Sequence, residues 1–110
     1  MDEARRQKRS TSYARVYLTA QQKYGYLRDL SAEGCRMSFL DAPGLEAGQE
    51  ADVVIVPDRE LRLPRVPAVL LVRWVRAEGA SHFVGGALFS IPEAHTEAWR
   101  RLVTFFLERP

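Results

Sequence analysis

With 110 residues, of which 46% are hydrophobic and 27% charged, and a formal net charge of +2 at pH 7, the chain has the composition of one ordinary globular domain. It is too short for an enzyme with separate cofactor and substrate domains, and its composition excludes collagen, a coiled coil and a disordered tail. No apolar stretch of about 18 residues and no hydrophobic segment behind the charged start are present, so we expect no transmembrane helix, no secretory signal and a cytoplasmic location.

The chain begins with a polar segment that has no hydrophobic periodicity. This predicts a flexible basic arm over residues 1–12, followed by a single domain over residues 13–110. From Ser12 onward the sequence alternates, with apolar residues at Ala14, Val16 and Leu18, which is typical of a half-buried first strand.

Further segments alternate or are rich in β-branched residues, and turn residues separate them. In the segment over residues 35–39, Cys35, Met37 and Phe39 are expected to face the core, and Arg36 and Ser38 to face outward. Short strands at such regular spacing predict a mostly β fold, a six-stranded antiparallel β-barrel. The later predicted strands cover residues 24–28, 35–39, 51–56, 66–76 and 82–89.

After Pro92 the period changes to that of a helix. Proline fits the first turn of a helix, and the acidic Glu93 and Glu97 follow near the positive end. We expect a C-terminal α-helix over about residues 93–108 that caps one mouth of the barrel. Its apolar stripe comprises Ala98, Trp99, Leu102, Val103, Phe106 and Leu107.

Residue types that carry chemistry are scarce. One cysteine, Cys35, excludes an intramolecular disulfide, and with His82 and His95 it matches no metal-ligand spacing, so we expect neither a metal nor a cofactor. No nucleophile elbow, phosphate-binding loop or dinucleotide fingerprint occurs, so we expect no enzymatic activity.

Two short motifs stand out in chain order. Arg5-Arg6-Gln7-Lys8-Arg9 has the form R-x-x-x-R just before the first strand, and Asp29-Leu30-Ser31-Ala32-Glu33-Gly34 has the form D-x-S-x-x-G in the predicted turn between the second and third strands. Together with six strands and a terminal helix, this order resembles the PilZ domain, the bacterial receptor module for cyclic di-GMP. The resemblance covers nearly the whole chain. One departure is the polar Arg6-Gln7-Lys8 between the motif arginines, where many members have an apolar residue.

The resemblance implies roles for individual residues. Arg5 and Arg9 would bind phosphate and the O6/N7 edge of guanine, and Arg6 would add positive charge. Asp29 would accept hydrogen bonds from the N1/N2 edge of guanine, and Ser31 would add a hydroxyl contact. Gly34 would provide a positive φ or allow close approach to the ligand.

Trp74 has two interpretations. It occupies the place where an aromatic residue stacks on guanine in some PilZ domains, or it is a residue of the barrel interior. Arg36, just after the second motif, would either contact the ligand or face solvent. Cys35 is expected to be a small core residue.

The resemblance implies a receptor or adaptor that orders its N-terminal arm when cyclic di-GMP binds and signals to a partner protein. The partner, from motility, pilus or exopolysaccharide machinery, is not identified by the sequence. One alternative is a PilZ-like interaction adaptor that binds no nucleotide. Another is a small barrel that binds nucleic acid, although the low net charge makes nucleic acid an unexpected partner.

Overall fold

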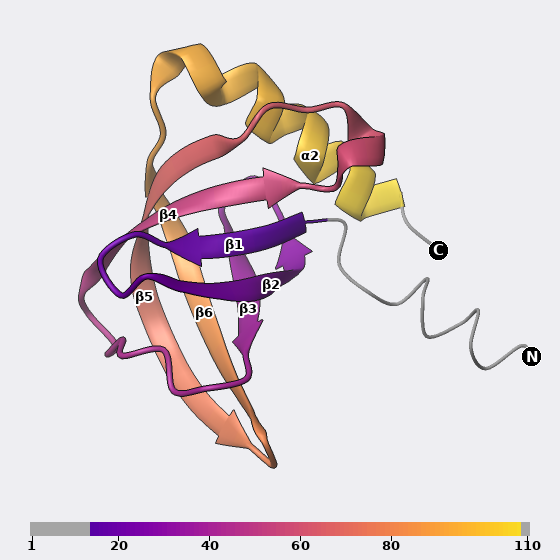
Figure 1. Ribbon diagram of the computed structural model, residues 1–110. Coiled ribbons are helices and arrows are strands. Elements are labelled where there is room, and N and C mark those ends of the chain that lie inside the picture. The colour runs from indigo at the N-terminus through magenta and orange to yellow at the C-terminus, as the bar shows by residue number, and fades with distance from the viewer. Residues whose placement is uncertain (1–13, 109–110) are drawn as a thin grey trace, which may run out of the picture.

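A computed structural model describes residues 14–108 of the chain. Its strands form a closed antiparallel barrel in the order β1-β2-β3-β6-β5-β4, with β4 pairing back onto β1 (Figure 1). This confirms the predicted six-stranded barrel. The strands are β1 (Ala14–Leu18), β2 (Lys23–Leu30), β3 (Gly34–Phe39), β4 (Glu50–Pro57), β5 (Val66–Glu78) and β6 (Ser81–Ser90).

The barrel interior is filled by the apolar residues of each alternating pattern. Val16, Leu27, Ile55 and Leu70 are all fully buried, and each comes from a different strand. Because successive side chains of a strand point to opposite faces, this alternation places every second residue inside. The same alternation therefore determines which residues are available on the outer face.

The second motif is only partly in a turn. The expectation of a turn from Asp29 onward is wrong, because β2 continues through Asp29 to Leu30 and β3 begins at Gly34. Residues 31–33 alone connect the two strands. Asp29 is therefore held by strand pairing, with Arg36 as its partner on β3.

Ser38 on β3 was expected to face solvent, but it is 3% exposed. Arg28 covers it and donates from Nε to the Ser38 Oγ at 2.7 Å. This hydrogen bond gives the buried Ser38 oxygen a donor, which offsets part of the cost of burying a polar side chain.

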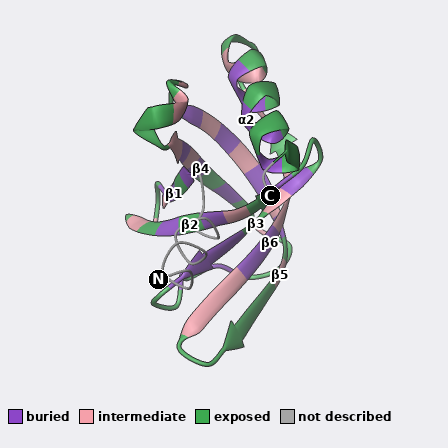
Figure 2. Cartoon of the chain, turned by 90° about the vertical axis from the view of Figure 1, so that its right-hand side faces the viewer, coloured by how far each residue is buried: buried purple, intermediate pink, exposed green. Residues whose placement is uncertain are grey.

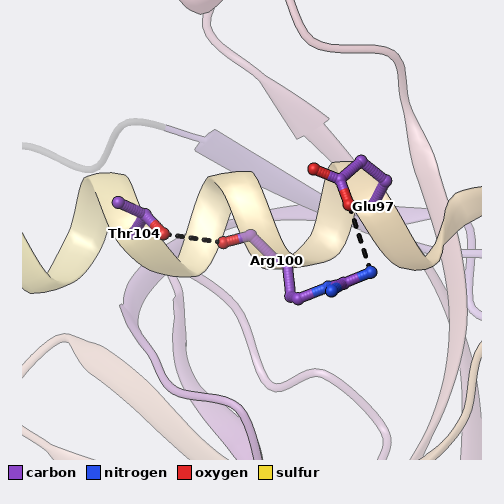
Figure 3. Close-up of polar contacts among 3 residues, drawn as sticks. All are labelled: Glu97, Arg100 and Thr104. Atoms are coloured by element: carbon purple, nitrogen blue, oxygen red, sulfur yellow. Dashed lines mark hydrogen bonds and ion pairs between the residues drawn. The ribbon is translucent and has the colours of Figure 1, made fainter.

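A helix closes one end of the barrel. The 3₁₀ turn η2 (Glu93–His95) leads into α2 (Thr96–Glu108), and the buried side of α2 faces the barrel (Figures 1 and 2). On its exposed side the Arg100 guanidinium pairs with Glu97 at 3.1 Å, and Thr104 Oγ1 donates to the Arg100 carbonyl (Figure 3). The apolar stripe was expected to include Leu107, which is wrong: Leu107 is 73% exposed, because the helix turns it away from the barrel.

The burial of Leu102 predicts how strongly α2 stabilises the barrel. Because Leu102 is fully buried, we expect Leu102→Ala to lower the free energy of unfolding by about 2–5 kcal/mol, as measured by urea denaturation. The matched control is Leu107→Ala on the same helix, which should change that free energy by less than about 0.5 kcal/mol. Equal losses from the two variants would contradict the assignment of Leu102 to the core.

Candidate functional site

The connection between β2 and β3 is a tight turn held by its own polar atoms. The Ser31 N–H donates to the Gly34 carbonyl at 2.8 Å, and the Ser31 Oγ accepts from the Glu33 N–H at 3.3 Å. Asp29 Oδ1 accepts from the N–H of Leu30 at 3.0 Å. Short polar side chains that bond to nearby backbone are the usual means of fixing such turns. The two polar residues of the motif are thus held in place locally.

Gly34 has a packing role rather than a conformational one. Its φ is not positive, so that part of the expectation is wrong. A Cβ at Gly34 would lie 2.2 Å from the Gly86 carbonyl oxygen and 3.0 Å from the Ala87 Cα. The backbone of β6 fills the space a side chain would need, so glycine is required where β3 and β6 meet.

A row of residues crosses four strands on the outer face of the barrel. Asp29 on β2 pairs with Arg36 on β3, Arg36 pairs with Gly85 on β6, and Gly85 pairs with Trp74 on β5. Residues in register on neighbouring strands share a face. The strand register therefore brings Asp29 and Trp74, which are 45 positions apart in the sequence, to the two ends of one row.

Two β-bulges turn the ends of this row outward. The register shifts between Leu27 and Asp29 and between Val72 and Trp74, which leaves Arg28 and Arg73 as unpaired extra residues. Strict alternation from the buried Leu27 and Val72 would direct Asp29 and Trp74 into the core. The bulges reverse this, which settles the position of Trp74: it lines a surface pocket.

The row forms the floor of a hollow of about 320 Å³ on the outer face. The predicted residues Asp29, Ser31, Gly34 and Trp74 all line it. Carboxylate, hydroxyl, guanidinium and indole groups converge there, which suits a planar ligand with both hydrogen-bond donors and negative charge. The other lining residues are Leu30, Glu33, Cys35, Arg36, Arg73, Gly85, Gly86 and Ala87.

The Trp74 ring lies directly over a glycine of β6. A Cβ at Gly85 would be 2.3 Å from both Cε2 and Nε1 of the indole, so the ring occupies the space of the missing side chain. The Arg76 guanidinium also lies over the ring, with its Cζ 4.8 Å from the centroid, and Arg76 Nε is 2.6 Å from Glu78 Oε2. Gly85 thus allows the indole to lie along the sheet. Arg76 lies over the indole, and Glu78 pairs with Arg76.

Several site residues were not found from the sequence. Arg73 reaches the pocket because it is the extra residue of a bulge, and no local pattern indicates a bulge. Gly85 and Gly86 are visible in the sequence as a glycine pair within a strand, which often marks close approach of another group. Arg36, for which contact and solvent exposure were both open, is exposed and lines the pocket.

The N-terminal half of the predicted site is not placed. Arg5, Arg6 and Arg9 lie outside the described residues, which begin at Ala14 on β1. Their assignment remains a prediction from the first motif.

Cys35 lines the pocket and packs against the core. Burial, and to a lesser extent the charge of Asp29, raise the pKa of its thiol to about 12. The thiol is therefore protonated at neutral pH, and Cys35 contributes no nucleophile to the pocket.

Within residues 14–108, no three His, Cys, Asp or Glu side chains group together in a way that could hold a metal ion. In the same part of the chain, no helix has the length and apolar character needed to cross a membrane.

Fold and pocket together define a small β-barrel with a polar–aromatic pocket on its outer surface. No model of a known protein family matches the chain, and no curated protein matches it in sequence. The barrel is similar in structure to the Bacillus subtilis inhibitor of motility, MotI/DgrA, with a TM-score of 0.70 at 14% sequence identity. The similarity covers 87% of this chain but only 46% of MotI/DgrA, and at this identity it establishes the fold.

The contact between Gly85 and Trp74 predicts a specific effect of adding one methyl group. Gly85→Ala should displace the indole from the sheet, which is measured as a shift of the Trp74 Nε1–H resonance in a ¹H–¹⁵N spectrum. Gly86→Ala is the matched control, because its Cβ would contact Leu70 at 3.3 Å and not the indole. An unmoved Trp74 resonance in Gly85→Ala would show that the ring does not rest on Gly85.

Proposed function

We propose that this protein is a PilZ-type receptor that binds cyclic di-GMP at the pocket between Asp29 and Trp74. The observation that supports this best is the cross-strand row, which brings the second motif and the candidate stacking residue into one pocket. The chain's own backbone register, rather than sequence proximity, produces this arrangement.

The chemistry of the pocket suits a guanine base. The Asp29 carboxylate accepts from the N1–H and N2–H₂ donors of guanine, and Ser31 adds a hydroxyl beside it. Guanine that stacks on Trp74 gains about 1–3 kcal/mol per base. Such stacking replaces the exposed cation–π contact of Arg76, worth about 0.5–1 kcal/mol, so the exchange favours the base.

The two phosphates of cyclic di-GMP require cationic partners. We assign this role to Arg5 and Arg9 of the first motif, with additional charge from Arg6. Arg36 and Arg73 also line the pocket and can add positive charge there. Ligand binding then orders residues 1–12 against the barrel and creates a surface that a partner protein recognises.

The proposed output is regulation through protein contact, without catalysis and in the cytoplasm. The similarly folded MotI/DgrA is named as an inhibitor of motility, which makes motility machinery one candidate target. The competing function is a PilZ-like adaptor that acts on its partner without a nucleotide, and ligand titration separates the two.

Calorimetric titration of cyclic di-GMP tests the receptor function directly. We expect saturable binding to the full chain, loss of binding in Arg5→Ala/Arg9→Ala because both phosphate partners are removed, and no binding of GTP as a control. Arg100→Ala/Arg101→Ala on the exposed face of α2 removes the same charge and should bind normally. No heat and no shifted amide resonances with the unaltered chain would overturn the receptor function and leave the adaptor.

Substitution of Trp74 tests the stacking interaction separately. Trp74→Ala should raise the Kd for cyclic di-GMP about 5- to 150-fold, because one base–aromatic stack is lost. Trp74→Phe retains an aromatic face and should recover most of the affinity. If alanine and phenylalanine had the same effect, Trp74 would support the pocket without stacking on the base.

A further inference from the structure

A second surface lies on the outer face of β1, β2 and the 3₁₀ turn η1 (Arg59–Leu61). On β1 and β2, Arg15 pairs with Tyr26, and Tyr17 pairs with Tyr24. We call this the tyrosine–arginine surface; it consists of Arg15, Tyr17, Tyr24, Tyr26, Arg59, Arg62 and Arg65. It includes two hollows of about 430 and 620 Å³, and both are lined by Arg15.

The charge of this surface is strongly positive. Arg59, Arg62 and Arg65 line one hollow together with Arg15, and all four residues are exposed. In the described part of the chain none of the four forms an ion pair, since the ion pairs there involve Arg76 and Arg100. The acidic residues nearby are fewer: Asp58 lines the same hollow, Glu60 is its neighbour, and Asp41 lines the other hollow. The excess of unpaired guanidinium groups favours an anionic partner.

The tyrosines distinguish between kinds of anionic partner. Tyr24 and Tyr26 are 53% and 44% exposed, but their rings already have partners. The Arg15 Cζ lies 4.9 Å from the Tyr24 centroid, and the Tyr17 ring lies 4.7 Å from it. The Arg28 Cζ lies 5.4 Å from the Tyr26 centroid. A base that stacks on Tyr24 has to displace Arg15 or Tyr17 and therefore gains less than it would on an open ring, whereas a protein segment can use the guanidinium forks and phenol hydroxyls where they are.

The composition of the surface is also that of a protein interface. Tyrosine and arginine are enriched at protein–protein interfaces and at their energetic centres, and lysine is depleted. Lys23 adds one further positive charge to the hollow lined by Tyr24 and Tyr26. Leu40, which is 75% exposed, adds an apolar contact beside Tyr24 and Tyr26.

We propose that the tyrosine–arginine surface binds an acidic segment of a partner protein. Carboxylates of the segment pair with Arg15, Arg59 and Arg62, and its apolar side chains pack on Leu40 and the tyrosines. This inference rests on the proposed function in one respect, because a receptor without catalysis acts through a partner. The surface adjoins the ligand pocket along β2, where Leu27 and Arg28 separate Tyr26 from Asp29.

The test uses a peptide probe and the full chain without cyclic di-GMP. The probe is a fluorescein-labelled peptide of five Glu-Glu-Leu repeats, and its binding is followed by fluorescence anisotropy. Arg59→Gln/Arg62→Asn should raise the Kd for the peptide about fivefold, as expected for the loss of two exposed charge pairs. Asparagine is chosen at Arg62 because the φ there is 55° and asparagine tolerates the left-handed region. Tyr24→Ser should also weaken binding.

Controls separate this surface from general attraction between charges. Arg100→Gln/Arg101→Gln removes the same charge from α2 and should change the Kd less than about twofold. A peptide of five Gln-Gln-Leu repeats should not bind, and an 11-residue oligothymidylate should bind more weakly than the acidic peptide.

Three outcomes would overturn the inference. They are no saturable binding of the acidic peptide, equal losses from the η1 and α2 variants, and tighter binding of the oligothymidylate, which would assign the surface to nucleic acid. Because no cyclic di-GMP is present, failure of the proposed receptor function leaves this result interpretable. Conversely, a variant that loses the peptide should still bind cyclic di-GMP, because its substitutions lie outside the ligand pocket.

Discussion

Where β3, β6 and β5 meet, both β3 and β6 have glycine, and backbone atoms and an indole ring fill the space that side chains would take. Gly34 lets β3 approach the β6 backbone, and Gly85 lets Trp74 lie along the sheet. A Cβ at either position would come within 2.3 Å of another group. The shape of the pocket therefore depends on residues that contribute no chemistry of their own.

The pocket also depends on two bulges that act in the same way on opposite sides. Each leaves one arginine, Arg28 or Arg73, without a partner in the ladder and turns the next residue outward. A bulge reverses the parity of a strand from that point on. Asp29 and Trp74 therefore face solvent although both follow strand residues whose alternation points inward. The two extra arginines have different uses: Arg28 covers Ser38 and Arg73 lines the pocket.

The barrel supports two distinct surfaces on its outer face. One presents hydrogen-bond acceptors, an indole and guanidinium groups in a pocket suited to a nucleotide. The other presents exposed tyrosines, together with arginines that form no ion pair within residues 14–108, over a broader area. Strand β2 contributes to both, with Tyr24 and Tyr26 at one end and Asp29 at the other. Strand β2 therefore links the pocket to the tyrosine–arginine surface through one continuous segment of backbone.

The sequence by itself determined the elements of the fold and the chemistry available to it. Its alternating apolar residues predict the six strands, and its change of period predicts the terminal helix, because burial of one face is what each pattern encodes. It also identified Asp29, Ser31, Gly34 and Trp74 as candidates, through motifs that resemble a known module. Only the tertiary structure decided that Trp74 faces the pocket, that Gly34 serves strand packing, that Leu107 is exposed and that Arg73 belongs to the site. The positions of the pocket residues depend on strand register, bulges and close approach between strands. These features arise from contacts between residues far apart in the chain, so the periodicity of the sequence does not indicate them.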